Sequence, residues 1–199
     1  MIDLMVHAQL RFLRDFLSHL ERDIALEWSE IEARNEEGAF HDFGDYEAAM
    51  DYPLFREEFA AKSLFNELNI LVEETLHSAA ASAWRAEQAS QGANSLPKPE
   101  WELPIGKIWE LIENHHNVNR KNLPGWDVYN KLREINNAFK HRRGFRRFSD
   151  LFQSDKKTLE DARHKAKIDN AKRFIDEIAP FILSVAKLAI NDMYQGREQ

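Results

Sequence analysis

Three side chains suited to phosphodiester chemistry recur every four residues in one segment, at Arg133, Asn137 and His141. Arginine holds phosphate oxygens in a bidentate manner, asparagine orients a hydroxyl, and histidine can transfer protons near neutral pH. On a helix, positions four residues apart are offset by only about 40°, so the three side chains can contact one ligand lying along the helix. The row suits an RNA ligand and metal-independent cleavage through the 2′-hydroxyl of RNA. Alternatively, it is an ordinary polar helix face, whose last turn carries histidine to complement the helix dipole.

The same segment is predicted to form an amphipathic helix that positions this row. Its apolar positions repeat at helical spacing and form the face expected to be buried: Val128, Leu132, Ile135 and Phe139. The opposite face is expected to point away from the bundle core. Further residues are predicted to bind phosphate through amide or cationic groups: Asn136, Lys140, Arg142, Arg143, Arg146 and Arg147.

The stretch LREINNAFKHRRG, residues 132–144, resembles the motif region of the HEPN superfamily of helical-bundle proteins. Two long helices are predicted before this stretch and one after it, which is similar to the helix order of that family. The resemblance implies a four- or five-helix fold. It also implies a ribonuclease of a toxin–antitoxin or antiviral system that works as a homodimer, with RNA as substrate and an antitoxin-like protein as a further partner.

The family motif begins with an arginine, followed by a polar residue and then by a histidine a few positions later. Asn137 and His141 match the polar residue and the histidine, whereas Asn136 occupies the place of the arginine. Arg133, or Arg142 and Arg143, can supply the cation from other positions. The departure implies either a shifted active site or a non-catalytic relative that binds RNA, a nucleotide or a protein.

Charge is distributed unevenly along the chain, whose formal net charge is −7. Residues 21–60 contain thirteen Asp or Glu and three Arg, whereas residues 120–147 contain nine Lys or Arg and two acidic residues. The basic block fits an RNA ligand. Alternatively, the two blocks are solvated faces, or pair with each other within a bundle or across a dimer.

Helical periodicity dominates the remaining sequence and predicts one all-α domain, residues 1–199, folded as an up-and-down bundle of about five helices. A first helix is expected to end near Gly38, a second to start near Pro53, and a short one to cover residues 105–116. Glycine, proline and polar residues predict loops at about 38–53, 91–104 and 117–125.

Two alternatives to a nuclease follow from the residues. Glu74-x-x-His77 and Glu113-x-x-His116 each place a carboxylate and an imidazole on one helical face, as in di-metal carboxylate bundles, but such pairs are expected by chance in a chain with eight histidines. The other alternative is a non-enzymatic helical interaction module. Signatures of phosphate-binding loops, serine-hydrolase elbows and zincins are absent from the sequence.

The sequence contains no cysteine, so neither disulfides nor thiolate metal sites are available. Its first residues lack the apolar core of a signal peptide, and no window approaches the roughly 20 apolar residues of a membrane-spanning helix. We therefore expect a cytoplasmic protein that needs no cofactor or metal and does not associate with a membrane.

Overall fold

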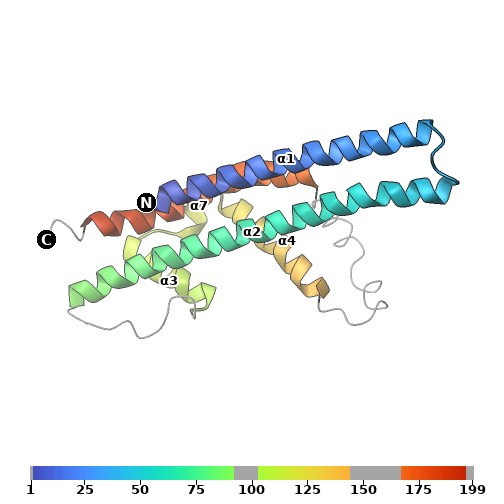
Figure 1. The fold of residues 1–199 in the computed structure, drawn as a ribbon. Helices are drawn as coiled ribbons and strands as arrows, with labels where there is room; N and C mark the ends of the chain where they lie inside the picture. The colour runs from blue at the N-terminus through green and yellow to red at the C-terminus, as the bar shows by residue number, and fades with distance from the viewer. Residues whose placement is uncertain (1, 92–102, 144–166, 196–199) are drawn as a thin grey trace. The chain divides into compact units, whose positions relative to one another are not determined.

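The computed structural model is an all-α bundle in the residues that it describes, as predicted. It describes the backbone of residues 2–91, 103–143 and 167–195, and the side chains of residues 4–88, 103–137 and 167–190. The helices in these ranges are α1 (Ile2–Glu36), α2 (Phe43–Gln91), α3 (Ile105–His116), the 3-10 helix η2 (Arg120–Asn122), α4 (Trp126–Arg143) and α7 (Ile168–Gln195) (Figure 1).

The chain divides into two compact units, each built from segments that are distant in sequence. Unit 1 comprises Met1–Leu10, Leu68–Arg133 and Asp176–Gln199, and unit 2 comprises Arg11–Glu67 and Glu134–Ile175. Four helices, α1, α2, α4 and α7, contribute residues to both units. The prediction of one domain is not tested by this division and stays a prediction.

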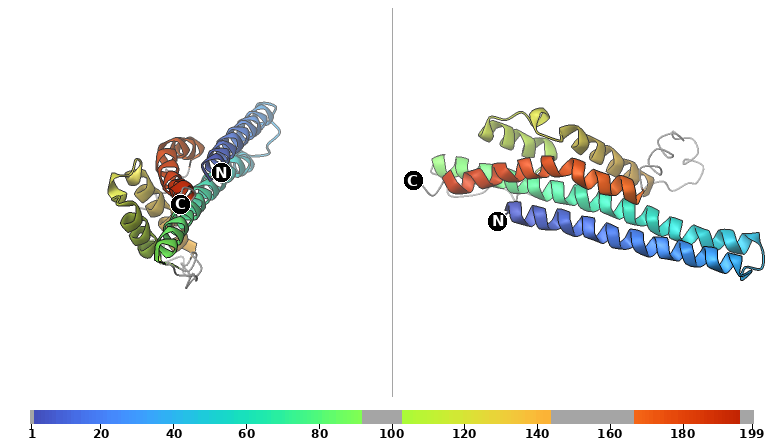
Figure 2. Two further views of the ribbon diagram at one scale, coloured as in Figure 1. Left: turned by 90° about the vertical axis from the view of Figure 1, so that its left-hand side faces the viewer. Right: turned by 90° about the horizontal axis from the view of Figure 1, so that it is seen from above.

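In unit 2, α1 and α2 form an antiparallel hairpin with a short connection (Figures 1 and 2). Gly38 ends α1 in the left-handed conformation, with φ of 71°, which glycine adopts without steric cost. Asp42 Oδ1 then accepts a hydrogen bond of 2.9 Å from the backbone N–H of Asp45 and caps the start of α2. The predicted loop at 38–53 is therefore too long, because α2 already begins at Phe43 and continues through the buried Pro53.

The core of unit 2 lies between the hairpin, α4 and α7. Phe65 of α2 packs edge-on against Phe174 of α7, with ring centres 5.2 Å apart. Ion pairs join the helices at the margin of this core: Arg56 Nη1 of α2 lies 2.7 Å from Glu27 Oε2 of α1, and Lys172 of α7 pairs with Glu21 of α1. Aromatic packing inside and paired charges outside hold the helices of this unit together.

In unit 1, α2, α3, α4 and α7 surround a second core. The α2 segment there has buried small residues that permit close helix contact: Ala79, Ala80, Ala81 and Ala83. Ser82 Oγ donates a hydrogen bond of 3.0 Å to the carbonyl of Ala189, so α2 and α7 approach within hydrogen-bond distance. This run of small residues is therefore a helix-packing surface.

The connection between α3 and α4 spans residues 117–125, which confirms the predicted loop, and η2 occupies its middle. The predicted loop at 91–104 lies largely outside the described residues. In the described part of the chain, no helix is both long and apolar enough to cross a membrane.

Candidate nucleic-acid interface

Helix α4 presents a buried face and an exposed face, and the buried face differs from the predicted one. Tyr129, Leu132, Ile135 and Asn136 are buried, whereas Val128 is only half-buried and the side chain of Phe139 lies outside the described residues. The prediction of Leu132 and Ile135 is confirmed. The buried face is rotated toward Tyr129 and Asn136 because both side chains have specific partners on neighbouring helices.

Asn136 is part of the core of unit 2 and does not belong to an exposed phosphate site. Its side chain is only 4% exposed, and its Nδ2 donates a hydrogen bond of 3.0 Å to the carbonyl of Phe65 on α2. A buried amide must satisfy its hydrogen-bonding groups inside the protein. The prediction that Asn136 binds phosphate is therefore wrong for this fold, because its side chain joins α4 to α2.

Arg133 and Asn137 are both exposed on α4, one turn apart. The guanidinium carbon of Arg133 lies 5.6 Å from the centre of the Tyr129 ring, within the range of a cation–π contact. Among the described side chains, no carboxylate is within ion-pair distance of Arg133. The Tyr129 ring thus positions the guanidinium group of Arg133 on the exposed side of the helix.

The ring under Arg133 belongs to an aromatic cluster in unit 1 that consists of Trp109, Trp126, Tyr129 and Phe181. Tyr129 stacks on Phe181 at 4.7 Å with an interplanar angle of 8°, and Trp109 meets Trp126 edge-on at 5.5 Å. Burial raises the pKa of the Tyr129 phenol above its ordinary value, against the opposing effects of the Arg133 charge and a hydrogen bond from Trp109. Tyr129 is therefore a neutral, rigid platform for Arg133.

A second arginine contacts the same cluster but is already neutralised. The guanidinium of Arg120 lies 5.4 Å from the centre of the Trp109 ring and hydrogen-bonds Glu113 Oε2, while the Arg120 backbone N–H donates to Glu113 Oε1 at 2.8 Å. The Arg120 side-chain hydrogen bond is the main cause that lowers the pKa of Glu113. Because Arg120 is paired with Glu113, it stabilises the connection before α4 and does not present its charge to a ligand.

The remaining predicted site residues lie wholly or partly outside the described residues. Lys140, His141, Arg142 and Arg143 belong to the described backbone of α4, but their side chains do not belong to the described part. Arg146 and Arg147 lie outside it altogether. Arg133 in unit 1 and Asn137 in unit 2 are thus each exposed, and Asn136 is buried. The position of the His141 side chain stays a prediction.

The di-metal alternative does not fit the described side chains. Within them, no group of three or more His, Asp or Glu residues is arranged to hold a metal ion. Both carboxylate oxygens of Glu113, one of the four residues of that prediction, accept hydrogen bonds from Arg120. A carboxylate engaged in this way is a structural acceptor and not a bridging ligand.

Sequence reasoning missed the role of Tyr129. The spacing of four residues between Tyr129 and Arg133 was a usable signal, because residues at i and i+4 of a helix are neighbours on its surface. Comparisons with models of protein families, with curated proteins and with solved structures found no match.

Proposed function

We propose that this protein is a HEPN-like RNA-binding protein that acts through the exposed face of α4, as a metal-independent ribonuclease of a cytoplasmic toxin–antitoxin or antiviral system. The observation that carries the proposal is the exposed Arg133, without a carboxylate partner among the described residues and fixed on Tyr129, with Asn137 one turn further along. His141 follows after another turn of the same helix. Tight RNA binding then requires cationic contacts with phosphate, which Arg133 and the basic residues after it supply.

The proposed reaction uses the RNA's own nucleophile. His141 takes the proton of a 2′-hydroxyl, the 2′-oxygen attacks the adjacent phosphorus, and the bond from phosphorus to the 5′-oxygen breaks. The leaving 5′-oxygen takes a proton from water or from His141 of a second copy. The products are a 2′,3′-cyclic phosphate and a 5′-hydroxyl, and Arg133 stabilises the charge on the phosphoryl oxygens.

The test is cleavage of a panel of tRNA and single-stranded RNA by the purified full-length protein in EDTA. We expect His141→Ala to lower the cleavage rate at least about 100-fold and Arg133→Ala to weaken RNA binding about 10-fold. Lys187→Ala, which removes an exposed cation from α7, is the matched control and should change neither. Failure of the wild-type protein both to bind and to cleave any RNA in the panel would overturn the proposal.

A second candidate function is a non-enzymatic interaction module, and the burial of Asn136 favours it. The HEPN motif arginine has no counterpart at this position, and the asparagine there serves the core of unit 2. In that case wild-type protein should bind RNA or a protein partner without cleaving RNA. His141→Ala should then alter self-association or partner binding, measured by sedimentation velocity, with no activity to lose.

A further inference from the structure

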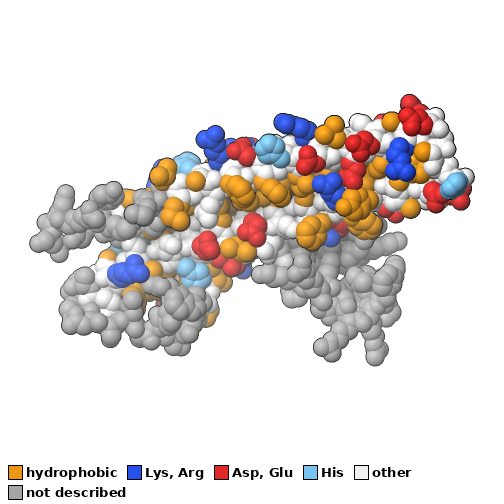
Figure 3. Space-filling model, viewed as in Figure 1, with side chains coloured by type: hydrophobic (Ala, Val, Ile, Leu, Met, Phe, Trp, Pro, Cys, Tyr) orange, Lys and Arg blue, Asp and Glu red, His pale blue; other side chains and the backbone are white. Residues whose placement is uncertain are grey.

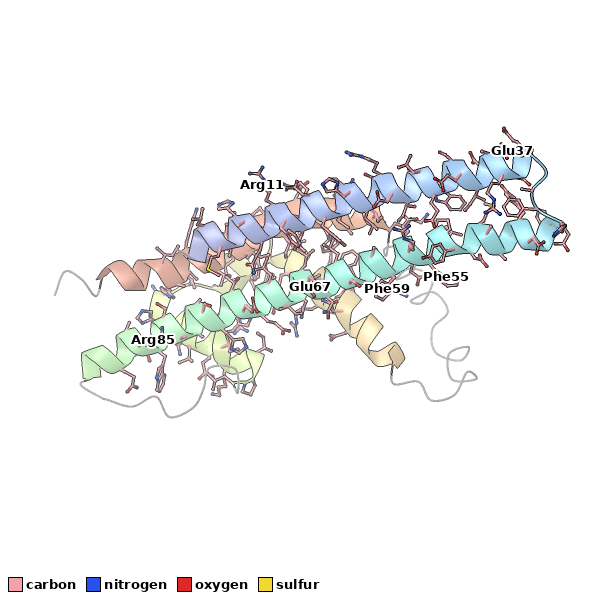
Figure 4. All side chains as sticks on the ribbon, viewed as in Figure 1. Arg11, Glu37, Phe55, Phe59, Glu67 and Arg85 are labelled. Carbon is pink, nitrogen blue, oxygen red and sulfur yellow. The ribbon has the colours of Figure 1, made fainter. Side chains whose placement is uncertain are left out.

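An aromatic stripe lies on the outer face of α2 in unit 2. It consists of Tyr52, Phe55 and Phe59, which are 61%, 67% and 70% exposed. Their spacing of three and four residues places them on one face of the helix. Figure 4 labels Phe55 and Phe59 on α2, and Figure 3 shows hydrophobic side chains exposed along the hairpin.

This stripe is separate from the face by which α2 packs into unit 2. The same turns of the helix bury Ala60, Ala61 and Leu64. Because single exposed apolar residues are common on protein surfaces, one phenylalanine would need no explanation. Three consecutive aromatic positions on one helical face, in a helix whose opposite face is already packed, are typical of a surface that binds a partner.

The charges beside the stripe indicate which kind of partner can bind it. The two cations in this part of α2 are already paired, Arg56 with Glu27 and Lys62 with Glu58. By contrast, Glu47 and Asp51 are exposed, and no cation among the described side chains lies within ion-pair distance of either. The segment from Arg11 to Glu67 carries fifteen acidic and six basic residues. The stripe thus has two exposed carboxylates beside it that lack a cationic partner among the described side chains.

We propose that the stripe binds a basic amphipathic helix of a partner protein. The apolar side of such a helix packs on Tyr52, Phe55 and Phe59, and its flanking Lys or Arg residues reach Glu47 and Asp51. RNA does not fit, because its phosphates would be repelled by these carboxylates. The same face of a second copy fits poorly too, since its two cations in this part of α2, Arg56 and Lys62, are already paired and are not available to Glu47 and Asp51. The inference is independent of RNA binding by α4.

The test uses three synthetic 18-residue helical peptides as probes, with binding to the full-length protein measured by fluorescence anisotropy. The first has Leu at positions i, i+3, i+4 and i+7 with flanking Lys, the second has the same Leu positions with flanking Glu, and the third is a scrambled form of the first. We expect only the first to bind. Its affinity should fall with rising salt, because exposed charge pairs are screened.

Protein variants identify the surface. Phe55→Asp combined with Phe59→Asp should weaken binding of the first peptide at least about 10-fold. Glu47→Gln combined with Asp51→Asn should weaken it and flatten the salt dependence. The matched control is Phe12→Asp combined with Phe16→Asp, which changes an exposed aromatic pair of α1 and should leave the affinity unchanged.

Three results would overturn the proposal. One is equal binding of the Lys and Glu peptides, and another is unchanged affinity in the Phe55 and Phe59 variant. The third is that the wild-type protein self-associates in sedimentation velocity, that the Phe55 and Phe59 variant abolishes this self-association, and that the Lys peptide does not bind. In that case a second copy of the protein occupies the stripe. Since every altered residue is exposed, the variants should keep the helical circular dichroism and melting temperature of the wild type. Peptide binding and self-association are both measured without RNA.

Discussion

Asn136 and Asn137 are adjacent and chemically identical, but the fold gives them different roles. The side chain of Asn136 is buried and bonded to the Phe65 carbonyl, whereas that of Asn137 is exposed. In a helix, adjacent residues are separated by about 100°, so one of the pair can point inward while the other points to solvent. This difference decides which asparagine can meet a ligand and which one stabilises the fold.

Replacing Asn136 should therefore affect stability far more than replacing Asn137. We expect Asn136→Ala to lower the free energy of unfolding by about 1–3 kcal/mol, because the hydrogen bond to Phe65 is lost inside the core. Asn136→Arg should lower it further by burying an unpaired charge. Urea denaturation measures both. Asn137→Arg is the control, with a change within about 0.5 kcal/mol, and equal stability of the two arginine variants would contradict this account.

Tyr129 links the core of unit 1 to the surface of α4. One part of its ring stacks on Phe181, and the ring also lies under the guanidinium of Arg133. Because burial is the largest cause of its raised pKa, the neutral phenol is favoured in the folded protein.

The raised pKa of Tyr129 predicts a loss of stability at alkaline pH. Below the ordinary tyrosine pKa of about 10 the phenol is neutral in both the folded and unfolded states. Above it the unfolded state releases its proton first, so the free energy of unfolding falls as pH rises through the folded pKa. Tyr129→Phe should remove this part of the decline, measured by urea denaturation from pH 8 to pH 11. An identical pH profile in wild type and Tyr129→Phe would show that the phenol does not contribute.

At the scale of elements, the connection from α3 to α4 sets where α4 begins. Asn117 ends α3 in the left-handed conformation, and the Glu113 carboxylate accepts hydrogen bonds from Arg120. Gly125, with φ of 76°, then turns the chain into α4. A Cβ at Gly125 would lie 3.1 Å from Phe181 Cβ and 3.3 Å from the backbone nitrogen of Phe181. Gly125 is thus required both by its backbone conformation and by close contact with α7.

Gly125→Ala should lower the free energy of unfolding by about 1–3 kcal/mol, because the substitution adds strain at a positive φ and a clash with α7. Gly106→Ala is the matched control. Gly106 lies in the first turn of α3, where an added Cβ would meet no atom within 4 Å, so this change should be neutral or stabilising by up to about 1 kcal/mol. Thermal unfolding followed by circular dichroism compares the two. A smaller loss in the Gly125 variant than in the Gly106 variant would refute the role given to Gly125.

At the scale of the whole molecule, the two units differ in what they expose. Unit 1 contains the aromatic cluster that holds Arg133, and unit 2 contains the acidic hairpin with the aromatic stripe of α2. Among the described side chains, Arg120 pairs with Glu113, and Lys131 and Arg133 have no carboxylate within ion-pair distance.

The two units should unfold together, because the backbone hydrogen bonds of α1, α2, α4 and α7 continue from one unit into the other. We expect Phe181→Leu in unit 1 and Phe65→Leu in unit 2 each to shift a single unfolding transition, by roughly 1–2 kcal/mol. Near- and far-ultraviolet circular dichroism should give the same midpoint in each variant. Two transitions, with each variant moving only one, would show that the units are independently stable.

The sequence alone determined the features that depend on local interactions. The all-α class, the end of the first helix near Gly38, the helix at residues 105–116 and the loop at 117–125 follow from apolar periodicity and turn-forming residues, and the structure confirms them. The exposed position of Arg133 and Asn137 follows from the same periodicity, since side chains on one helical face share an environment.

Only the tertiary structure decided the features that depend on contacts between distant segments. The burial of Asn136 requires the Phe65 carbonyl, 71 residues away in sequence, and the rotation of the α4 face requires Phe181 of α7. Likewise, α2 continues through Pro53, although proline removes a helical hydrogen bond, and the Pro53 ring is buried. Packing free energy at these positions outweighs local preference, and a single sequence read along the chain carries no measure of packing between distant helices.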